Sequence, residues 1–284
     1  MKFLHSDLLT CPLDQHALQL DEDCLRCEGG HAFDIARQGY VNLLGAADKR
    51  SRDPGDGKEM VAARRGFLSD GHYQPVADRL AGLVKQQINS DSTIVDAGCG
   101  EGYYLEQLAT QIASSSHCKP TVIGFDISKW AVQAATRRLA ATWLVASNRN
   151  IPLAADSVDC LISLFGFPVF NSFRSILKEG GTLLMVDAGP QHLIELRKVI
   201  YPEVRRSDST MLKQACAAGF LEAETSTLRF QTDPLSQLQI HQLLSMTPHL
   251  FRATREGKER AARLDHFPVT VDIVFQRLHK RENT

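Results

Sequence analysis

The sequence has no excess of charge of either sign, and it has no long hydrophobic run. Its 32 basic and 33 acidic residues leave a formal net charge of -1, so bulk electrostatics favours neither nucleic acid nor a membrane surface as a partner. The longest apolar run, "CLISLFGFPVF", is too short to cross a bilayer, and the N-terminal "MKFLHSDLLTCP" lacks the continuous apolar segment of a signal peptide. These absences predict a soluble, cytoplasmic protein that does not bind membranes.

Internal repeats and low-complexity tracts are also absent, and cysteine is sparse. Of the 7 cysteines, Cys11, Cys24 and Cys27 form a local group, and the dispersed ones are typical of reduced thiols inside a cell. A chain of 284 residues with 43% apolar content can bury one large core and a small satellite. We divide it into a small domain over residues 1–42, a basic loop and linking helix over 43–75, and a main domain over 76–284.

Strand-like and helix-like segments alternate from Thr93 onward. The strand-like segments are "TIVDAG", "TVIGFD", "TWLVAS", "SVDCLISLF" and "GGTLLMVDAG", and the helix-like segments between them include "YYLEQLATQI" and "SKWAVQAATRRL". Such alternation is typical of βαβ units. The main domain is therefore predicted to be an α/β fold, with a mostly parallel sheet and helices on both faces.

The clearest chemical signal is the glycine-rich turn in "TIVDAGCGEGYY". A β-branched strand ends at Asp96, and Gly98, Gly100 and Gly102 precede a helix, so the backbone can approach a ligand closely beside a positively polarised helix N-terminus. A dinucleotide fingerprint needs a third glycine where Tyr103 stands. The spacing is instead similar to the first motif of the S-adenosylmethionine-dependent methyltransferases, which have a Rossmann-like fold.

A second acid supports this interpretation. Asp126 ends the next strand, where a carboxylate can accept hydrogen bonds from both ribose hydroxyls of a nucleoside. The alternative is a tight turn with a capping aspartate and no ligand. We expect S-adenosylmethionine to bind at Asp96, Gly98, Gly100, Glu101, Gly102 and Asp126.

Several stretches resemble the RlmA family of bacterial large-subunit rRNA (guanine-N1)-methyltransferases. They are "HAFDIARQGYVNLL", "KRSRDPGDGKEMVAARRGFLSDGHYQPV", "DAGCGEGYY", "GPQHLIELRKVIYPEV" and "LLSMTPHLFRA", which run nearly end to end. The resemblance implies a zinc-ribbon-like N-terminal domain, a Rossmann-like methyltransferase domain, 23S rRNA as the partner and a homodimer. It also implies that Tyr73 and His192 contact the cofactor.

The family's metal site departs from its pattern in this sequence. The pattern C-x-x-C followed by C-x-x-x-H implies Cys11, Asp14, Cys27 and His31 as zinc ligands, with Asp14 in place of a thiolate. Zinc accepts a carboxylate oxygen, but the additional Cys24 could supply a softer fourth donor. Residues three apart on one strand face opposite ways, which argues against Cys24 beside Cys27. We prefer Cys11, Cys24, Cys27 and His31, with a metal-free hairpin as the alternative.

Methylation of guanine N1 requires removal of its proton, so a base is needed. The candidate carboxylates are Glu101, Asp53, Asp56 and Asp187, among which the sequence does not choose. The loop "SLFGFPVFNSF" also departs from the family, because Pro168 falls one place late. Its Phe165 and Phe167 could stack on a base or cap the sheet.

Two basic groups could position phosphates without reading sequence. They comprise Lys49, Arg50, Arg52, Arg64 and Arg65 in the first group, interleaved with acids, and Arg197, Lys198, Arg205 and Arg206 in the second. Three functions therefore remain open at this point. The favoured one is an rRNA guanine-N1 methyltransferase; the others are a methyltransferase of a small metabolite and a non-catalytic RNA-binding relative.

Overall fold

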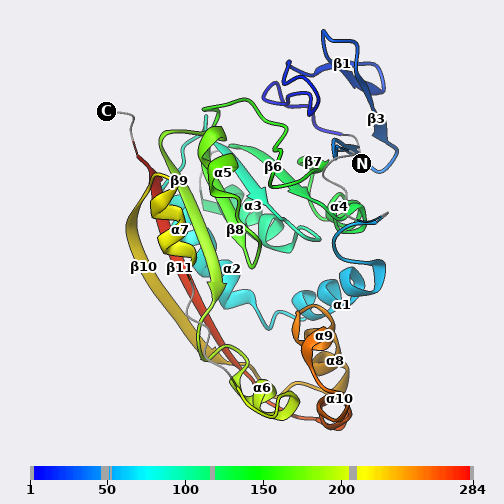
Figure 1. The fold of residues 1–284 in the computed structure, drawn as a ribbon, viewed down its shortest axis with the longest axis vertical. Helices are drawn as coiled ribbons and strands as arrows, with labels where there is room; N and C mark the ends of the chain where they lie inside the picture. The colour runs from blue at the N-terminus through cyan, green and yellow to red at the C-terminus, as the bar shows by residue number, and fades with distance from the viewer. Residues whose placement is uncertain (1–2, 46–50, 52, 116–118, 205–209, 282–284) are drawn as a thin grey trace.

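The computed structural model describes residues 3–45, 51, 53–115, 119–204 and 210–281 (Figure 1). Some sequence predictions fall outside these ranges, namely those made for the basic residues Lys49, Arg50, Arg52, Arg205 and Arg206 and for Cys118, one of the dispersed cysteines. The described part of the chain forms one 11-stranded sheet in the order β1-β2-β3-β4-β7-β6-β5-β8-β9-β11-β10.

The centre of the sheet is parallel. It consists of β7 (Thr142–Val145), β6 (Thr121–Asp126), β5 (Thr93–Ala97), β8 (Val158–Leu164) and β9 (Leu177–Ala188). Two long strands, β11 (Thr270–Lys280) and β10 (Phe220–Gln231), continue the sheet in antiparallel pairing beyond β9. The prediction of a mostly parallel sheet is confirmed, although the long antiparallel pair was not predicted.

Helices cover both faces of this sheet, as the alternating segments predicted. Neighbouring strand residues enter different cores: Ile94 packs into one, whereas Val95 packs into the other. The first core is covered by α1 (Lys58–Ser69), α2 (Gln74–Lys85), α3 (Tyr103–Ser115) and α4 (Lys129–Ala135), and the second by α5 (Phe170–Ile176) and α7 (Met211–Ala217). None of the helices in the described ranges is both long and apolar enough to cross a membrane.

The N-terminal segment forms a small ribbon that continues the main sheet. Its strands are β1 (Gln19–Asp21), β2 (Cys24–Arg26), β3 (Ala32–Ala36) and β4 (Tyr40–Asn42), paired antiparallel in sequence order. Strand β4 also pairs in parallel with β7, through Val41 opposite Leu144. The domain boundary expected at residue 42 therefore coincides with the end of a strand that is bonded to both parts.

A helical extension lies at the opposite end of the molecule from the ribbon (Figure 1). It contains α6 (Ile194–Ile200), α8 (Gln237–Ser245), α9 (His249–Arg252) and α10 (Arg255–Ala261), the last three between β10 and β11 in sequence. Helix α8 packs against α1, and α10 packs against α6. The extension thus supports the helix that precedes the main domain.

Two glycines make room for the side chain of Trp143, which is 1% exposed. A Cβ atom at Gly124 would lie 2.2 Å from Cζ3 of the indole, and one at Gly102 would lie 3.1 Å from its Cη2. The indole Nε1 donates a hydrogen bond to Leu139 O at 2.9 Å, which fixes the ring in place. The ring cannot move aside without losing that bond, so both positions require glycine.

This packing gives a prediction in which one chemical change has opposite effects at two sites. Gly124→Ala should lower the free energy of unfolding by about 1–3 kcal/mol, because the added methyl group overpacks the core. Gly82→Ala should raise it by about 0.5–1 kcal/mol, since Gly82 lies in α2 and an added Cβ meets nothing within 4 Å. Urea denaturation followed by circular dichroism measures both values. Equal effects at the two positions would contradict the packing argument.

Candidate active site and metal centre

The glycine-rich turn lies at the carboxyl end of β5. The amides of Gly98 and Cys99 both donate to Phe125 O, at 2.9 and 3.0 Å. Gly98 has a φ of +87°, and a Cβ atom there would meet nothing within 4 Å, so open space lies in front of this backbone. The backbone at Gly98 is therefore not covered by neighbouring side chains, which is the property that its glycine predicted.

Asp126 is held in one orientation by the same turn. Its Oδ2 accepts from the amide of Gly100 at 3.0 Å, and its Oδ1 accepts from the amide of Ser128 at 2.8 Å. Burial nevertheless raises the pKa of this carboxyl group above its usual range. A fixed, half-buried acceptor at the end of the second strand stands at the place expected of a group that binds ribose hydroxyls.

Two buried carboxylate oxygens have no hydrogen-bond partner among the described residues, Asp96 Oδ1 and Glu101 Oε1. Asp96 is 2% exposed, and burial together with the negative charge of Asp126 raises its pKa to about 7. Unsatisfied buried acceptors are rare in folded proteins and call for a partner. Both residues belong to the glycine-rich segment, and their unpaired oxygens suit a ligand that carries hydrogen-bond donors or positive charge.

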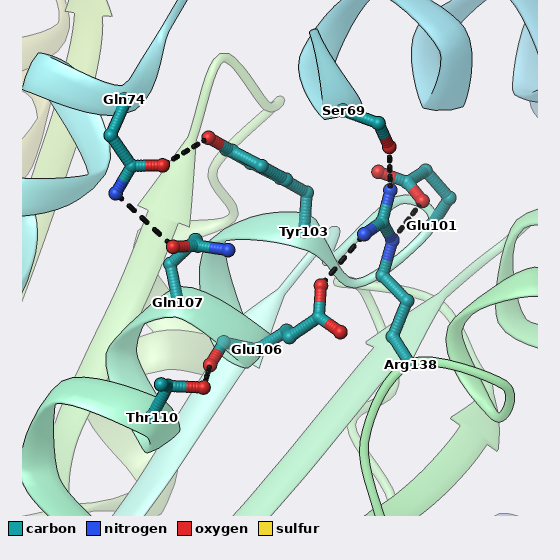
Figure 2. Close-up of polar contacts among 8 residues, drawn as sticks. All are labelled: Ser69, Gln74, Glu101, Tyr103, Glu106, Gln107, Thr110 and Arg138. Atoms are coloured by element: carbon teal, nitrogen blue, oxygen red, sulfur yellow. Dashed lines mark hydrogen bonds and ion pairs between the residues drawn. The ribbon is translucent and has the colours of Figure 1, made fainter. Parts of the chain in front are cut away.

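Glu101 connects the turn, through Arg138, to α1 and α3 (Figure 2). Its Oε2 forms a short ion pair with Arg138 Nε, just beyond α4. Arg138 also donates to Glu106 of α3 at 2.7 Å and to Ser69 at the end of α1 at 3.0 Å. Figure 2 shows a second link nearby, in which Gln74 of α2 accepts from Tyr103 at 3.0 Å.

Tyr73 and His192 are brought together although 119 positions separate them. The Tyr73 hydroxyl lies 3.3 Å from His192 Nε2, and the amide of Asp272 donates to His192 Nδ1 at 3.3 Å. Since Nδ1 accepts, Nε2 carries the proton and donates to Tyr73. Burial lowers the pKa of His192 to about 4, so this ring is neutral at pH 7.

Asp272 in turn holds the segment that carries His192. Its side chain is fully buried, accepts from the amide of Gln191 at 2.8 Å and from Arg229 Nε at 3.1 Å. Sequence analysis did not identify Asp272 or Arg138, because each reaches the site through contacts between distant segments, and no local pattern distinguishes either residue.

The four candidate bases differ in their surroundings. Asp53 pairs with Lys129 at 2.6 Å, Asp56 pairs with Arg64 at 2.7 Å, and Glu101 pairs with Arg138. Asp187, at the carboxyl end of β9, has no ion pair within the described residues, and burial raises its pKa to about 6. It is therefore the candidate whose charge is not already matched by a cation.

The loop with the late proline lies beside Asp187. Phe165 donates its amide to Val186 O at 2.9 Å and adopts a positive φ of 49°, a strained conformation for a bulky residue. Its ring stacks on His192 with centroids 6.4 Å apart and is 41% exposed. Phe167 is 86% exposed. Both rings, which could stack on a base or cap the sheet, are thus accessible at the carboxyl end of β8.

The structure brings Cys11, Asp14, Cys27 and His31 together, with one donor atom of each within 4.8 Å of the others. His31 Nδ1 lies 3.5 Å from Cys11 Sγ, 3.4 Å from Cys27 Sγ and 3.0 Å from Asp14 Oδ2. Tetrahedral zinc, with bonds of about 2.0–2.3 Å, separates its donors by about 3.3–3.8 Å. Both nitrogen–sulfur distances lie in this range and the nitrogen–oxygen distance is slightly shorter, so the four side chains can hold a zinc ion after a small shift.

Cys24 lies outside this cluster, which corrects the preference for it over Asp14. Its thiol, on β2, donates to Asp21 O at 3.2 Å. The physical reason is the alternation of side chains along a strand, which turns Cys24 away from Cys27. The sequence "CEGGH" also makes room for the carboxylate, because a Cβ atom at Gly29 would lie 2.1 Å from Asp14 Oδ2.

Comparison with known proteins agrees with this geometry. Residues 9–52 match the family described as RlmA, N-terminal, and residues 94–187 match the family described as methyltransferase domain. The chain is 31% identical to the 23S rRNA (guanine(748)-N(1))-methyltransferase of Streptomyces fradiae, over 94% of this chain and 95% of that protein. A Bacillus subtilis protein, YxjB, provisionally assigned 23S rRNA guanine-N1 methylation, is 28% identical over the same shares of the two chains.

A solved structure supports the fold alone. It is a complex between the Haloferax volcanii Trm112 methyltransferase activator and a provisionally named methyltransferase, with a TM-score of 0.53 at 21% identity. The match covers 81% of this chain and 100% of that chain.

Because the Streptomyces fradiae relative spans nearly the whole sequence, the resemblance is confirmed, and this chain belongs to the RlmA-type family of 23S rRNA (guanine-N1)-methyltransferases.

Proposed function

We propose that the chain transfers a methyl group from S-adenosylmethionine to N1 of a guanine in 23S rRNA. The observation that carries this proposal is the pair of acids, the buried Asp96 and the half-buried Asp126, beside a glycine turn with open space at Gly98. A methyltransferase of a small metabolite would explain this pair equally well, but not the four-donor cluster in the N-terminal ribbon.

The activity test separates these alternatives. Incubation with labelled S-adenosylmethionine and protein-free large-subunit rRNA, followed by mapping of the modified base, should find label on guanine N1. Label at another atom of the RNA would mean that the methylated atom is not guanine N1. An absence of label on RNA, with cofactor binding intact, would favour a metabolite substrate or a non-catalytic relative.

The proposed cofactor-binding residues contact different parts of S-adenosylmethionine. S-adenosylmethionine supplies an electrophilic methyl group on a sulfonium centre. Asp126 accepts from the ribose hydroxyls, and the backbone around Gly98 and Gly100 allows close approach. Asp96 offers its unpaired oxygen to the ligand's amino group. The full set of proposed contacts is Tyr73, Asp96, Gly98, Gly100, Glu101, Gly102, Asp126 and His192.

Asp187 is the proposed base for the guanine N1 proton. Asp187 lies at the carboxyl end of β9, directly after Val186, whose carbonyl accepts from the Phe165 amide, and it has no ion pair within the described residues. A pKa of about 6 leaves it deprotonated at pH 7 yet basic enough to accept a proton. The exposed rings of Phe165 and Phe167 would stack on a base and orient it.

The proposed zinc ligands are Cys11, Asp14, Cys27 and His31. The ribbon is too small to offset its chain entropy by burial alone, and a structural zinc ion supplies folding free energy outright. Two further properties stay predictions. The resemblance implies a homodimer, which light scattering would test, and action on rRNA implies a cytoplasmic location.

The first prediction here concerns the turn. Gly100→Val should weaken S-adenosylmethionine binding at least tenfold, because a side chain at φ +56° is strained and its Cβ would lie 3.3 Å from Arg64 Nη1, so the turn must distort. Gly180→Val is the matched control, since Gly180 has a φ of +70° near the start of β9, away from the turn. Calorimetry should find an unchanged affinity for the control. Unchanged affinity in both variants would exclude the turn as the cofactor site.

The second prediction concerns Asp187, the proposed base. Under single-turnover conditions the methylation rate should rise with pH through about 6 and level off above, because only the deprotonated Asp187 accepts a proton. Asp187→Asn should lower this rate by about 10²–10⁴-fold and leave cofactor affinity unchanged. Asp233→Asn, at an exposed position, is the control. A wild-type rate in Asp187→Asn would assign the proton to another acceptor.

The third prediction concerns the zinc ion of the N-terminal ribbon. Elemental analysis of the purified protein should find about one zinc per chain, as a single four-ligand site requires. Asp14→Asn should reduce this zinc content under a chelator challenge, whereas Cys24→Ser should retain it, because Cys24 lies outside the cluster. The reverse order would make Cys24 the ligand. A zinc-free protein after metal-supplemented expression would mean that the ribbon folds without metal.

A further inference from the structure

Helices α1 and α4 pack together, and residues of both helices line a groove of ≈ 390 Å³ between them. On each side the lining residues follow the spacing of successive helical turns, so they share one face of the helix. They are Lys58, Ala62 and Arg65 on α1, and Trp130, Ala134 and Arg137 on or just beyond α4. Small and apolar residues thus form the floor, and cations stand near the ends.

A second hollow of ≈ 420 Å³ continues from this groove toward the N-terminal ribbon. It is lined by Arg37 and Gln38, in the turn between β3 and β4, and by Thr136 and Arg137 after α4. Arg137 lines both hollows, so they adjoin on the surface. We call the cations along them, Arg37, Lys58, Arg65 and Arg137, the basic track.

The cations of the basic track are available to a ligand, although the charge of Arg65 also acts on Glu101, where burial raises the pKa of the carboxyl group and Arg65 opposes that rise. All four side chains belong to exposed residues, and none forms an ion pair with an acid in the part of the chain that the structure describes. Lys58 Nζ lies 4.1 Å from the centre of the Trp130 ring, which restricts the lysine before any ligand binds. In a chain of net charge -1, such a row of unmatched cations is a local feature.

The basic track adjoins the cofactor turn. Arg137 points to the groove, whereas the next residue, Arg138, forms the buried ion pair with Glu101 of the turn (Figure 2). At the other end of α4, Ser128 donates its hydroxyl to Asp56 O, before α1, and its amide to Asp126. A polyanion on the track would therefore lie next to the proposed cofactor site.

We propose that the basic track binds the phosphodiester backbone of the RNA substrate and leads it from the N-terminal ribbon to the active site. Three arginines present planar donor forks that suit phosphate oxygens, and such contacts position RNA without reading its sequence. This proposal rests on the proposed function. A small metabolite would not need cations that extend as far as Arg37 in the ribbon.

The test compares two double variants in which the same amount of positive charge is removed. Arg65→Gln/Arg137→Gln should weaken binding of in vitro transcribed 23S rRNA at least tenfold. The slope of log Kd against log salt should fall by about one for each phosphate group that no longer pairs with an arginine. The control is Lys119→Gln/Arg263→Gln, two exposed cations before β6 and after α10. Filter binding at several salt concentrations measures affinity and slope, and calorimetry of S-adenosylmethionine confirms that both variants are folded.

The outcomes distinguish a failure of the basic-track proposal from a failure of the proposed methyltransferase function. Equal RNA affinity and salt slope in the two double variants would overturn the basic track, even if the wild-type protein methylates 23S rRNA. A change in oligomeric state with unchanged RNA affinity would also overturn it and identify the groove as a contact between copies. If the wild-type protein binds RNA through the track but transfers no methyl group, the proposed function fails and the track stands.

Discussion

Two hydrogen bonds onto one carbonyl oxygen, that of Phe125, determine the shape of the glycine-rich turn. Parallel pairing sets Ala97 opposite Phe125, and the next two amides, of Gly98 and Cys99, both turn onto this oxygen. The amide of Gly100 then reaches Asp126. Because the chain must curl back over the end of the neighbouring strand, φ is positive at 98 and 100, which explains why glycine occupies both positions.

Buried charges hold the surroundings of this turn in position. Removing one partner of a buried ion pair such as Glu101 with Arg138 typically costs about 3–5 kcal/mol, although the intact pair contributes little net stability. Burial raises the pKa of Glu101 even though Arg138 opposes the shift. The pair therefore acts mainly by fixing where α1, α3 and the turn meet. Asp272 does the same for the segment that carries His192.

The features that were predictable from sequence are those encoded within a few neighbouring residues. The glycine spacing, the strand ends at Asp96 and Asp126, and the alternating segments each depend on local pattern. Arg138 and Asp272 were missed because their roles arise from contacts across the fold. The fourth member of the metal cluster was misjudged for a different reason: donor softness favoured Cys24, but backbone geometry decided the position, and a strand directs Cys24 elsewhere.

The site also weakens the protein that carries it. The raised pKa of Asp96, about 7, means that the folded chain holds a proton there at pH values where the unfolded chain has released it. From about pH 4 to 7 this residue therefore lowers the free energy of unfolding as pH rises. At higher pH the buried charge is complete, and its Oδ1 still lacks a partner among the described residues. A cationic or donating ligand would remove that penalty, so cofactor binding and stability are coupled at Asp96.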